Sequence, residues 1–208
     1  MNNEQLEQIN QYTYLGVAIN IDVKIDEEIN NRIAKANNIY YQLNHTILGK
    51  KEINTKTKIQ VYNTIYVPTL IYGSESWTIN KRVESRITAS EMKCLRKIHG
   101  VTRKDKIRNQ NIRLQLQTKP LIDNIHVRSL QWLGHITRMS EERLPKRVME
   151  ARPIGTRSKG RPRTEWSEYM ISVASNKGKT IEEAKKLATN RKEYRKWTLT
   201  PETVTRRR

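Results

Sequence analysis

Apolar residues recur along this chain mostly at steps of three and four positions, the spacing of helices that bury one face. Between Ile25 and about Leu48 such a stripe has three acidic residues in its first turn, which suit the start of a helix, and precedes Gly49, which suits its end. The stripe consists of Ile25, Ile29, Ile33, Ala36, Tyr40, Leu43 and Ile47. The pattern therefore predicts a mainly α protein whose first long helix covers residues 25–48.

Further segments carry helical signals. They are residues 55–65, which Pro68 ends or kinks, 80–99, a short helix within 102–118, a helix after Pro120, 164–176 and 180–197. The helix after Pro120 should turn Ile122, Ile125, Leu130, Leu133 and Ile136 inward. Thr180 and Glu183 have the spacing of a capping box, which supports a helix start at that point.

Residues 12–19, YTYLGVAI, instead predict a strand, because aromatic and β-branched residues dominate them. Gly16 inside the segment indicates a bend or a close backbone approach. An isolated strand needs a partner, and residues 3–9 are weak candidates for one. We therefore expect a short β-hairpin at the N-terminus.

The formal charge of +19 changes this picture, because a compact body with that charge repels itself. Residues 1–100 contain 13 Lys and Arg against 10 Asp and Glu, a net charge of +3. Residues 101–208 contain 27 against 11, a net charge of +16. A nucleic acid is the commonest polyanionic partner of such a chain, and the alternative is a protein that is merely basic.

Within residues 152–163, RPIGTRSKGRPR, prolines and glycines exclude a helix and predict a basic linker. Its segment Lys159–Arg163, KGRPR, is similar to the core of an AT-hook, which enters the minor groove of A·T-rich DNA. The same residues suit a nuclear-import signal or a solvated linker. Among the tryptophans that lie between cations, Trp132 and Trp166 are expected in the core rather than stacked on bases, and Trp197 is left open.

No catalytic or metal centre is evident. Cys94 is the sole cysteine, so an intrachain disulfide is excluded, and it has no set of neighbouring ligands that would suit zinc. The aspartates Asp22, Asp26, Asp105 and Asp123 are scattered along the chain. The N-terminus does not resemble a signal peptide, and no apolar run reaches the roughly 18 residues of a membrane span. We expect a protein of the nucleus or cytoplasm, neither secreted nor bound to a membrane.

Several blocks, in this order, resemble the C-terminal end of the endonuclease–reverse transcriptase of non-LTR (LINE-type) retrotransposons. The specific blocks are Leu70-Ile71-Tyr72-Gly73-Ser74-Glu75-Ser76-Trp77 and Leu130-Gln131-Trp132-Leu133-Gly134-His135-Ile136-Thr137-Arg138-Met139. Supporting blocks are Tyr14-Leu15-Gly16-Val17, Glu28-x3-Arg32-Ile33-x2-Ala36, Lys56-x-Lys58, Ile107-Arg108-Asn109, Gly160-Arg161-Pro162 and Trp166. Together they span roughly residues 10–170.

The resemblance implies a layout for the chain. Residues 1–24 would be the remnant of the palm and its primer-grip hairpin, and 25–100 a thumb-like helical bundle. Residues 101–200 would form a basic helical extension that contains the linker 152–163, and 201–208 a disordered Arg-rich tail. The paired aspartates of the polymerase palm are missing here, so Mg²⁺ would belong to the missing palm and no cofactor is expected in this chain.

The expected function is to bind RNA or DNA, holding template–primer, element RNA or target DNA, without catalysis by the chain alone. Two alternatives stay open: a part that complements a palm in an active reverse transcriptase, and a non-functional relic of a mobile element. The expected nucleic-acid-binding residues are Tyr14, Leu15, Gly16, Arg128, Arg138, Lys146, Arg147, Arg157, Lys159, Arg161 and Arg163. The expected partners are RNA, DNA and the missing palm of a related element.

Overall fold

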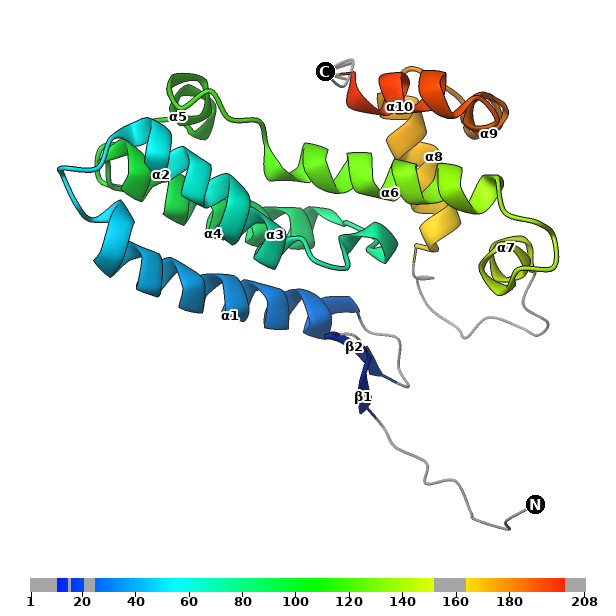
Figure 1. Cartoon of the computed structure of the whole chain (residues 1–208), viewed down its shortest axis with the longest axis horizontal. Coiled ribbons are helices and arrows are strands. Elements are labelled where there is room, and N and C mark those ends of the chain that lie inside the picture. Colours follow the sequence, from blue (N-terminus) through cyan, green and yellow to red (C-terminus); the bar gives the residue numbers. More distant parts are fainter. Residues whose placement is uncertain (1–10, 15, 21–24, 152–163, 201–208) are drawn as a thin grey trace, which may run out of the picture. The chain divides into compact units, whose positions relative to one another are not determined.

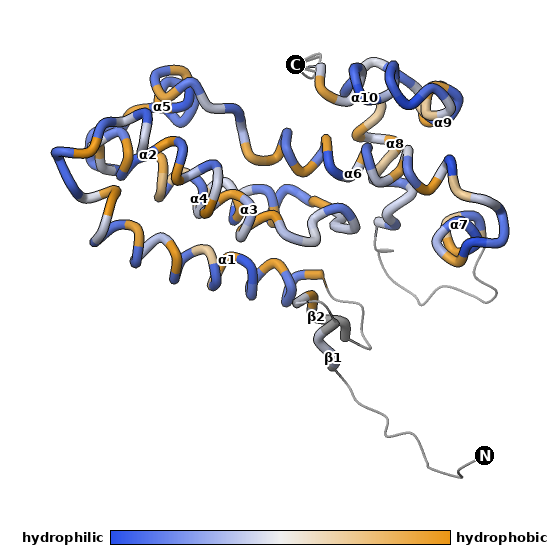
Figure 2. Tube along the Cα trace, viewed as in Figure 1, coloured by the Kyte–Doolittle hydropathy of each residue, from blue (hydrophilic) through white to orange (hydrophobic). Residues whose placement is uncertain are grey.

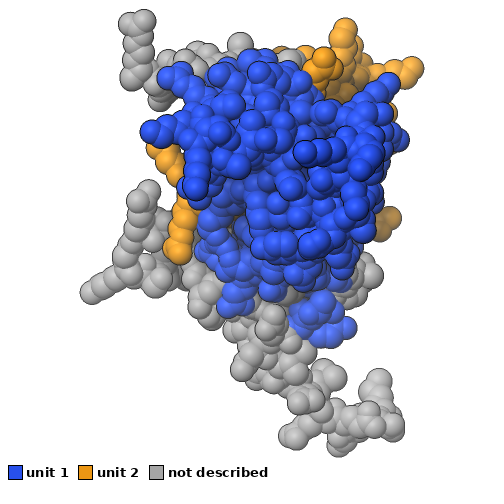
Figure 3. All heavy atoms as spheres, turned by 90° about the vertical axis from the view of Figure 1, so that its left-hand side faces the viewer, with its two compact units in different colours: residues 1–73, 85–116 blue, residues 74–84, 117–208 orange. Residues whose placement is uncertain are grey.

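The computed structural model describes residues 11–14, 16–20, 25–151 and 164–200. Within these residues the chain is mainly helical, as predicted, with one antiparallel pair of short strands (Figure 1). It divides into two compact units, residues 1–73 with 85–116 and residues 74–84 with 117–208 (Figure 3). The expected boundary near residue 100 thus falls inside the first unit, because residues 109–115 bond through their side chains to the helix that ends at His99.

The N-terminal strand prediction needs a correction. Residues 12–19 do not form one strand, because the segment folds back on itself into the hairpin that was expected. Strand β1 (Gln11–Tyr14) pairs with β2 (Val17–Asn20), and Tyr14 lies opposite Val17. Gly16 has a φ of 79°, a left-handed conformation that a glycine adopts readily in a tight hairpin turn. The glycine that suggested a bend therefore marks the turn itself.

The helices of the first unit follow the predicted apolar stripes, and Figure 2 shows apolar and polar residues alternating along α1. Their bounds are α1 Ile25–Leu43, η1 Asn44–Leu48, α2 Thr55–Val61, η2 Tyr62–Tyr66, α3 Val67–Leu70, α4 Lys81–His99 and α5 Asn109–Gln115. The first turn of α4 belongs to the second unit, and Asn80 caps it by accepting a hydrogen bond from the Val83 N–H at 3.0 Å. These helices confirm the predicted segments 25–48 and 80–99.

Pro68 does not end the helical run that starts at Thr55. The π-helical turn η2 precedes it, and the Val67 N–H bonds to the Tyr62 carbonyl, five residues back. Pro68 then stands in the first turn of α3, where its missing N–H costs least. The helical run therefore continues to Leu70.

The core of the first unit is closed by α1, η2, α3 and α4. Tyr66 is fully buried, and its hydroxyl donates to the Ser90 carbonyl at 2.8 Å. Cys94, also fully buried, lies on the same helix as Ser90, and burial raises the pKa of its thiol to about 12. The cysteine is therefore a packing residue, held as a neutral thiol.

The second unit contains the turn η3 Ser74–Ser76 and the helices α6 Leu121–Thr137, α7 Leu144–Glu150, α8 Trp166–Asn176, α9 Ile181–Ala188 and α10 Arg191–Leu199. Its core is made by Leu130, Leu133, Tyr169, Met170 and Val173. The predicted helix after Pro120 and the Thr180–Glu183 capping box are both confirmed. The predicted single helix 180–197 is wrong, because Asn190 accepts from the Glu193 N–H and starts α10 anew.

Candidate nucleic-acid interface

The N-terminal hairpin of the first unit is held by Arg32, a residue of α1. The buried Arg32 side chain donates from Nε to the Glu28 carboxylate at 2.5 Å and from Nη2 to the carbonyl of Gly16 in the hairpin turn. Its guanidinium carbon lies 4.6 Å from the centre of the Tyr72 ring, a cation–π contact. Arg32 thus connects the hairpin turn, α1 and the residue that precedes Gly73.

A residue larger than glycine would be strained at position 73. The φ of Gly73 is 73°, and a Cβ there would lie 3.1 Å from Cγ2 of Val17. The Tyr72 ring stays 45% exposed while Arg32 covers part of it. An exposed aromatic ring next to a cation can stack on a base. Sequence reasoning missed Arg32 and Tyr72 as site residues, although both stand in the blocks on which the resemblance rests.

In the second unit Glu75 joins two helices. Its carboxylate lies 3.4 Å from Nη1 of Arg128 in α6, and its carbonyl accepts from the Trp166 indole N–H at 3.0 Å. Trp77, two residues further, is buried. The Leu-Ile-Tyr-Gly-Ser-Glu-x-Trp block therefore has a structural reason: Gly73 turns the chain, Glu75 binds α6 and α8, and Trp77 fills the core.

The second specific block lies in α6. Leu130 and Leu133 are buried, whereas Trp132 is half-buried and its ring centre lies 5.5 Å from that of His135. The prediction that Trp132 lies in the core is therefore wrong, since the side chain is only half-buried. Position 132 lies at the edge of the apolar face of α6. Trp166 and Trp197 are partly buried and pack against the core.

Two of the predicted nucleic-acid-binding residues, Arg128 in α6 and Arg138 at its C-terminal end, make contacts with other parts of the protein. Arg128 lies next to Glu75, and Arg138 donates from Nη1 to the Ala188 carbonyl at 2.9 Å. Arg138 is nevertheless exposed, and Arg128 is half-buried. Both guanidiniums therefore have a structural role, and that of Arg138 also faces solvent, where it can meet a phosphate.

The two predicted residues of α7 differ from each other. Lys146 is buried, 3.1 Å from the Glu150 carboxylate and 3.6 Å from that of Glu141, and the Glu150 carboxylate raises its pKa. Arg147 is exposed. Since two carboxylates already balance the charge of Lys146, Arg147 is the better phosphate ligand of the pair.

Of the remaining residues predicted to bind nucleic acid, only Tyr14 and Gly16 lie in the described part of the chain. Tyr14 ends β1 and Gly16 lies in the turn that follows it. Leu15, Arg157, Lys159, Arg161 and Arg163 lie outside the described residues. The AT-hook-like segment and the linker therefore stay predictions from the sequence.

The described part of the chain contains neither a metal-binding cluster nor a membrane-spanning helix. No group of three or more His, Cys, Asp or Glu side chains in 25–151 and 164–200 or in the hairpin is arranged to hold a metal ion. In the same part of the chain, no helix combines the length and the apolar character needed to cross a bilayer.

A curated protein of transposon origin is similar to this chain. The transposon-derived protein F52C9.6 of Caenorhabditis elegans is 27% identical over 198 residues, which cover 91% of this chain and 70% of that protein. This similarity supports a mobile-element origin for the chain. No protein-family model matches the sequence, and no solved structure matches it.

Proposed function

We propose that this chain is a nucleic-acid-binding, C-terminal part of a non-LTR retrotransposon reverse transcriptase, inactive as a polymerase by itself. The observation that carries the proposal is the segregated charge, a net +16 on residues 101–208. Lys and Arg side chains that neutralise phosphates release the cations condensed on a nucleic acid, and this release drives binding. The similarity to a transposon-derived protein favours a nucleic acid over other polyanions.

The reverse-transcriptase assignment has a second support in the first unit. There Arg32 ties the turn of a hairpin to the start of a helical bundle, and it does so beside the exposed Tyr72 ring. In the family that the sequence resembles, a primer-grip hairpin leads into the thumb. This arrangement favours a role in holding template–primer duplex over a role as an unrelated basic protein.

Binding is tested by fluorescence anisotropy with labelled RNA and DNA duplexes of one sequence, over a series of salt concentrations. If about six phosphates are neutralised, the logarithm of affinity should fall with the logarithm of salt at a slope of about −5. Affinity that does not respond to salt, or no binding to either duplex, would contradict the proposal. A far-UV circular dichroism melt of the same sample separates this result from a relic that does not fold.

Catalytic inactivity is tested by primer extension on an RNA template with Mg²⁺ and with Mn²⁺. The purified chain should incorporate no nucleotide above background, because no paired aspartates are present to hold two ions. Incorporation by the chain alone would show that a catalytic site has been missed.

A further inference from the structure

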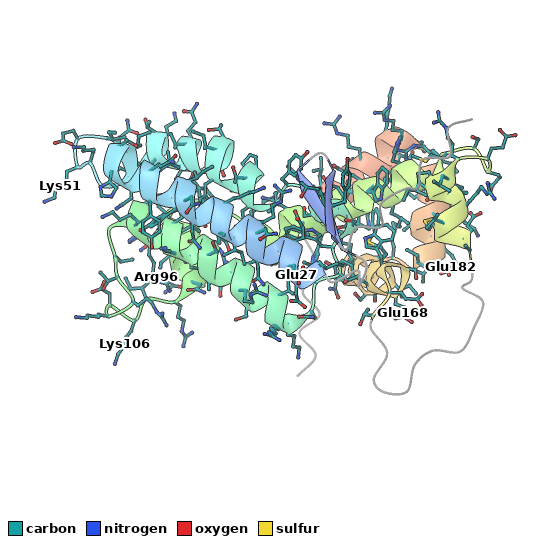
Figure 4. The ribbon with its side chains drawn as sticks, turned by 90° about the horizontal axis from the view of Figure 1, so that it is seen from below. Glu27, Lys51, Arg96, Lys106, Glu168 and Glu182 are labelled. Carbon is teal, nitrogen blue, oxygen red and sulfur yellow. The ribbon has the colours of Figure 1, made fainter. Side chains whose placement is uncertain are left out.

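The connection between α4 and α5 presents four cations within six residues. Arg103, Lys104, Lys106 and Arg108 are all exposed, and among the described residues no ion pair joins any of them to a carboxylate. Figure 4 shows Lys106 pointing away from the helices. Asp105 is the single acidic residue among them.

The Asp105 carboxylate is directed to the loop's own backbone. It accepts hydrogen bonds from the Thr102 N–H at 2.6 Å and from the Thr102 hydroxyl at 2.8 Å. These bonds lower the pKa of Asp105 from its ordinary value of 3.8, because they stabilise the charged form. The acidic residue therefore shapes the turn, while the cations on both sides of it remain available.

Both ends of the loop are fixed by bonds to α4. At the start, Gly100 has a φ of 84°, and the Val101 N–H bonds to the Arg96 carbonyl at 3.0 Å. At the end, Arg96 donates from Nη2 to the Asn109 side chain at 2.6 Å and to the Ile107 carbonyl at 3.5 Å. Arg96, labelled in Figure 4, therefore contacts the chain at both ends of the loop.

The helix that follows the loop is tied down as well. Arg113 of α5 donates to the buried Glu91 carboxylate of α4 at 2.6 Å, and His99 lies 2.5 Å from the Gln115 side-chain oxygen. These pairs hold α5 against α4 and so anchor the C-terminal end of the loop to the first unit. A loop that is ordered before binding loses less conformational entropy when a ligand arrives.

From this geometry we infer that the α4–α5 loop, residues 100–108, is a preformed binding site for the phosphate backbone of a nucleic-acid duplex. The inference rests on the proposed function and assigns a site to it. A duplex presents closely spaced negative charges along its length, which matches adjacent cations on a loop that is anchored at both ends. Because phosphate contacts carry no base code, this site should bind duplexes of unrelated sequence alike.

The test compares two quadruple variants of the full chain. The first replaces Arg103, Lys104, Lys106 and Arg108 by Gln. The matched control replaces four other exposed lysines of the same unit by Gln, namely Lys35, Lys50, Lys51 and Lys56. Both lose the same charge, and the probes are fluorescein-labelled RNA and DNA duplexes of one sequence.

For the loop variant the salt slope should become shallower by roughly 3–4, since each phosphate contact contributes about 0.9. For the control the slope should change by less than about 1, because charges beyond about 8 Å are largely screened at physiological salt. Equal losses in both variants would overturn the inference, since only total charge would then matter. Wild-type protein that binds neither duplex would instead overturn the proposed function.

A charge-retaining variant guards against misfolding as an explanation. Arg103→Lys, Lys104→Arg, Lys106→Arg and Arg108→Lys together should keep the wild-type slope. If this variant loses the slope while its thermal melt is unchanged, a phosphate site built on positive charge is the wrong account of the loop.

Discussion

The ring of Tyr194 in α10 lies directly over Gly134 in α6, where a Cβ would come within 2.3 Å of the ring carbon Cε1. The ring cannot swing away easily, because Tyr194 is buried and its hydroxyl donates to the Leu130 carbonyl at 2.7 Å. A glycine inside a helix costs about 1 kcal/mol relative to alanine. At position 134 the missing side chain allows α6 and α10 to come into contact, which offsets that cost.

Gly134→Ala should therefore destabilise the protein despite its better helix propensity. Overpacking of this kind costs about 1–3 kcal/mol, which exceeds or cancels the propensity gain. Urea denaturation measures the change in the free energy of unfolding. In a Tyr194→Leu background the same substitution should be neutral or stabilising, and a more stable single variant would contradict the close approach.

Trp132→Ala should cost about 1 kcal/mol, well below the loss for a fully buried tryptophan, because Trp132 is only half-buried and lies beside His135. Trp77→Ala is the control, since Trp77 is buried and its loss should cost about 3–5 kcal/mol. Thermal melts compare the two variants. Similar losses in both would restore Trp132 to the core, whereas weaker duplex binding by Trp132→Ala with an unchanged melt would make it a stacking surface.

Arg113→Ala should cost about 3–5 kcal/mol, because it removes the ion pair of a carboxylate that has no exposed surface. Replacing Glu91 by Leu as well should recover a large part of this loss. A double-mutant cycle on the free energies of unfolding gives the coupling. Additive losses would show that the 2.6 Å contact between Arg113 and Glu91 contributes little.

Asp105→Ala distinguishes an ordered loop from a simple accumulation of charge. The substitution removes a negative charge, so charge alone predicts tighter duplex binding. It also removes both bonds to Thr102, so an ordered site predicts binding that is unchanged or weaker. Anisotropy titrations of the variant and the wild type decide between the two, and clearly tighter binding would count against the preformed loop.

The turn that Asp105 and Thr102 form in the α4–α5 loop should become less stable at acid pH. Because the folded pKa of Asp105 lies below its ordinary value of 3.8, the carboxylate stabilises the turn above that pH. The stabilisation is lost as pH falls from 3.8 through the lowered pKa. An NMR titration of the Asp105 side chain should show the lowered midpoint in the wild type and a higher one in Thr102→Ala, which keeps only the backbone bond.

The basic linker gives a prediction from the sequence alone. Replacing Arg157, Lys159, Arg161 and Arg163 by Ala should make the salt slope shallower and weaken binding to unrelated sequences alike. A loss confined to A·T-rich DNA would favour minor-groove insertion. Unchanged affinity and slope would identify the segment as a solvated linker.

The sequence predicted the long helices well, because an apolar face repeated over four or more turns is hard to mistake. The prediction from the sequence failed where local hydrogen bonds or a turn interrupt such a pattern. Asn190 starts α10 inside what reads as one continuous helix, and Gly16 turns a single strand into two. It also could not find the role of Arg96, whose contacts with Ile107 and Asn109 depend on how α5 returns to α4.

The burial of Cys94 has a practical consequence for experiments. The chain has no other cysteine, and this one reacts with a thiol reagent only when the core of the first unit opens. The labelling rate of the unmodified protein thus reports the opening equilibrium of that unit. No engineered probe is needed to follow the first unit separately, since the second contains no thiol.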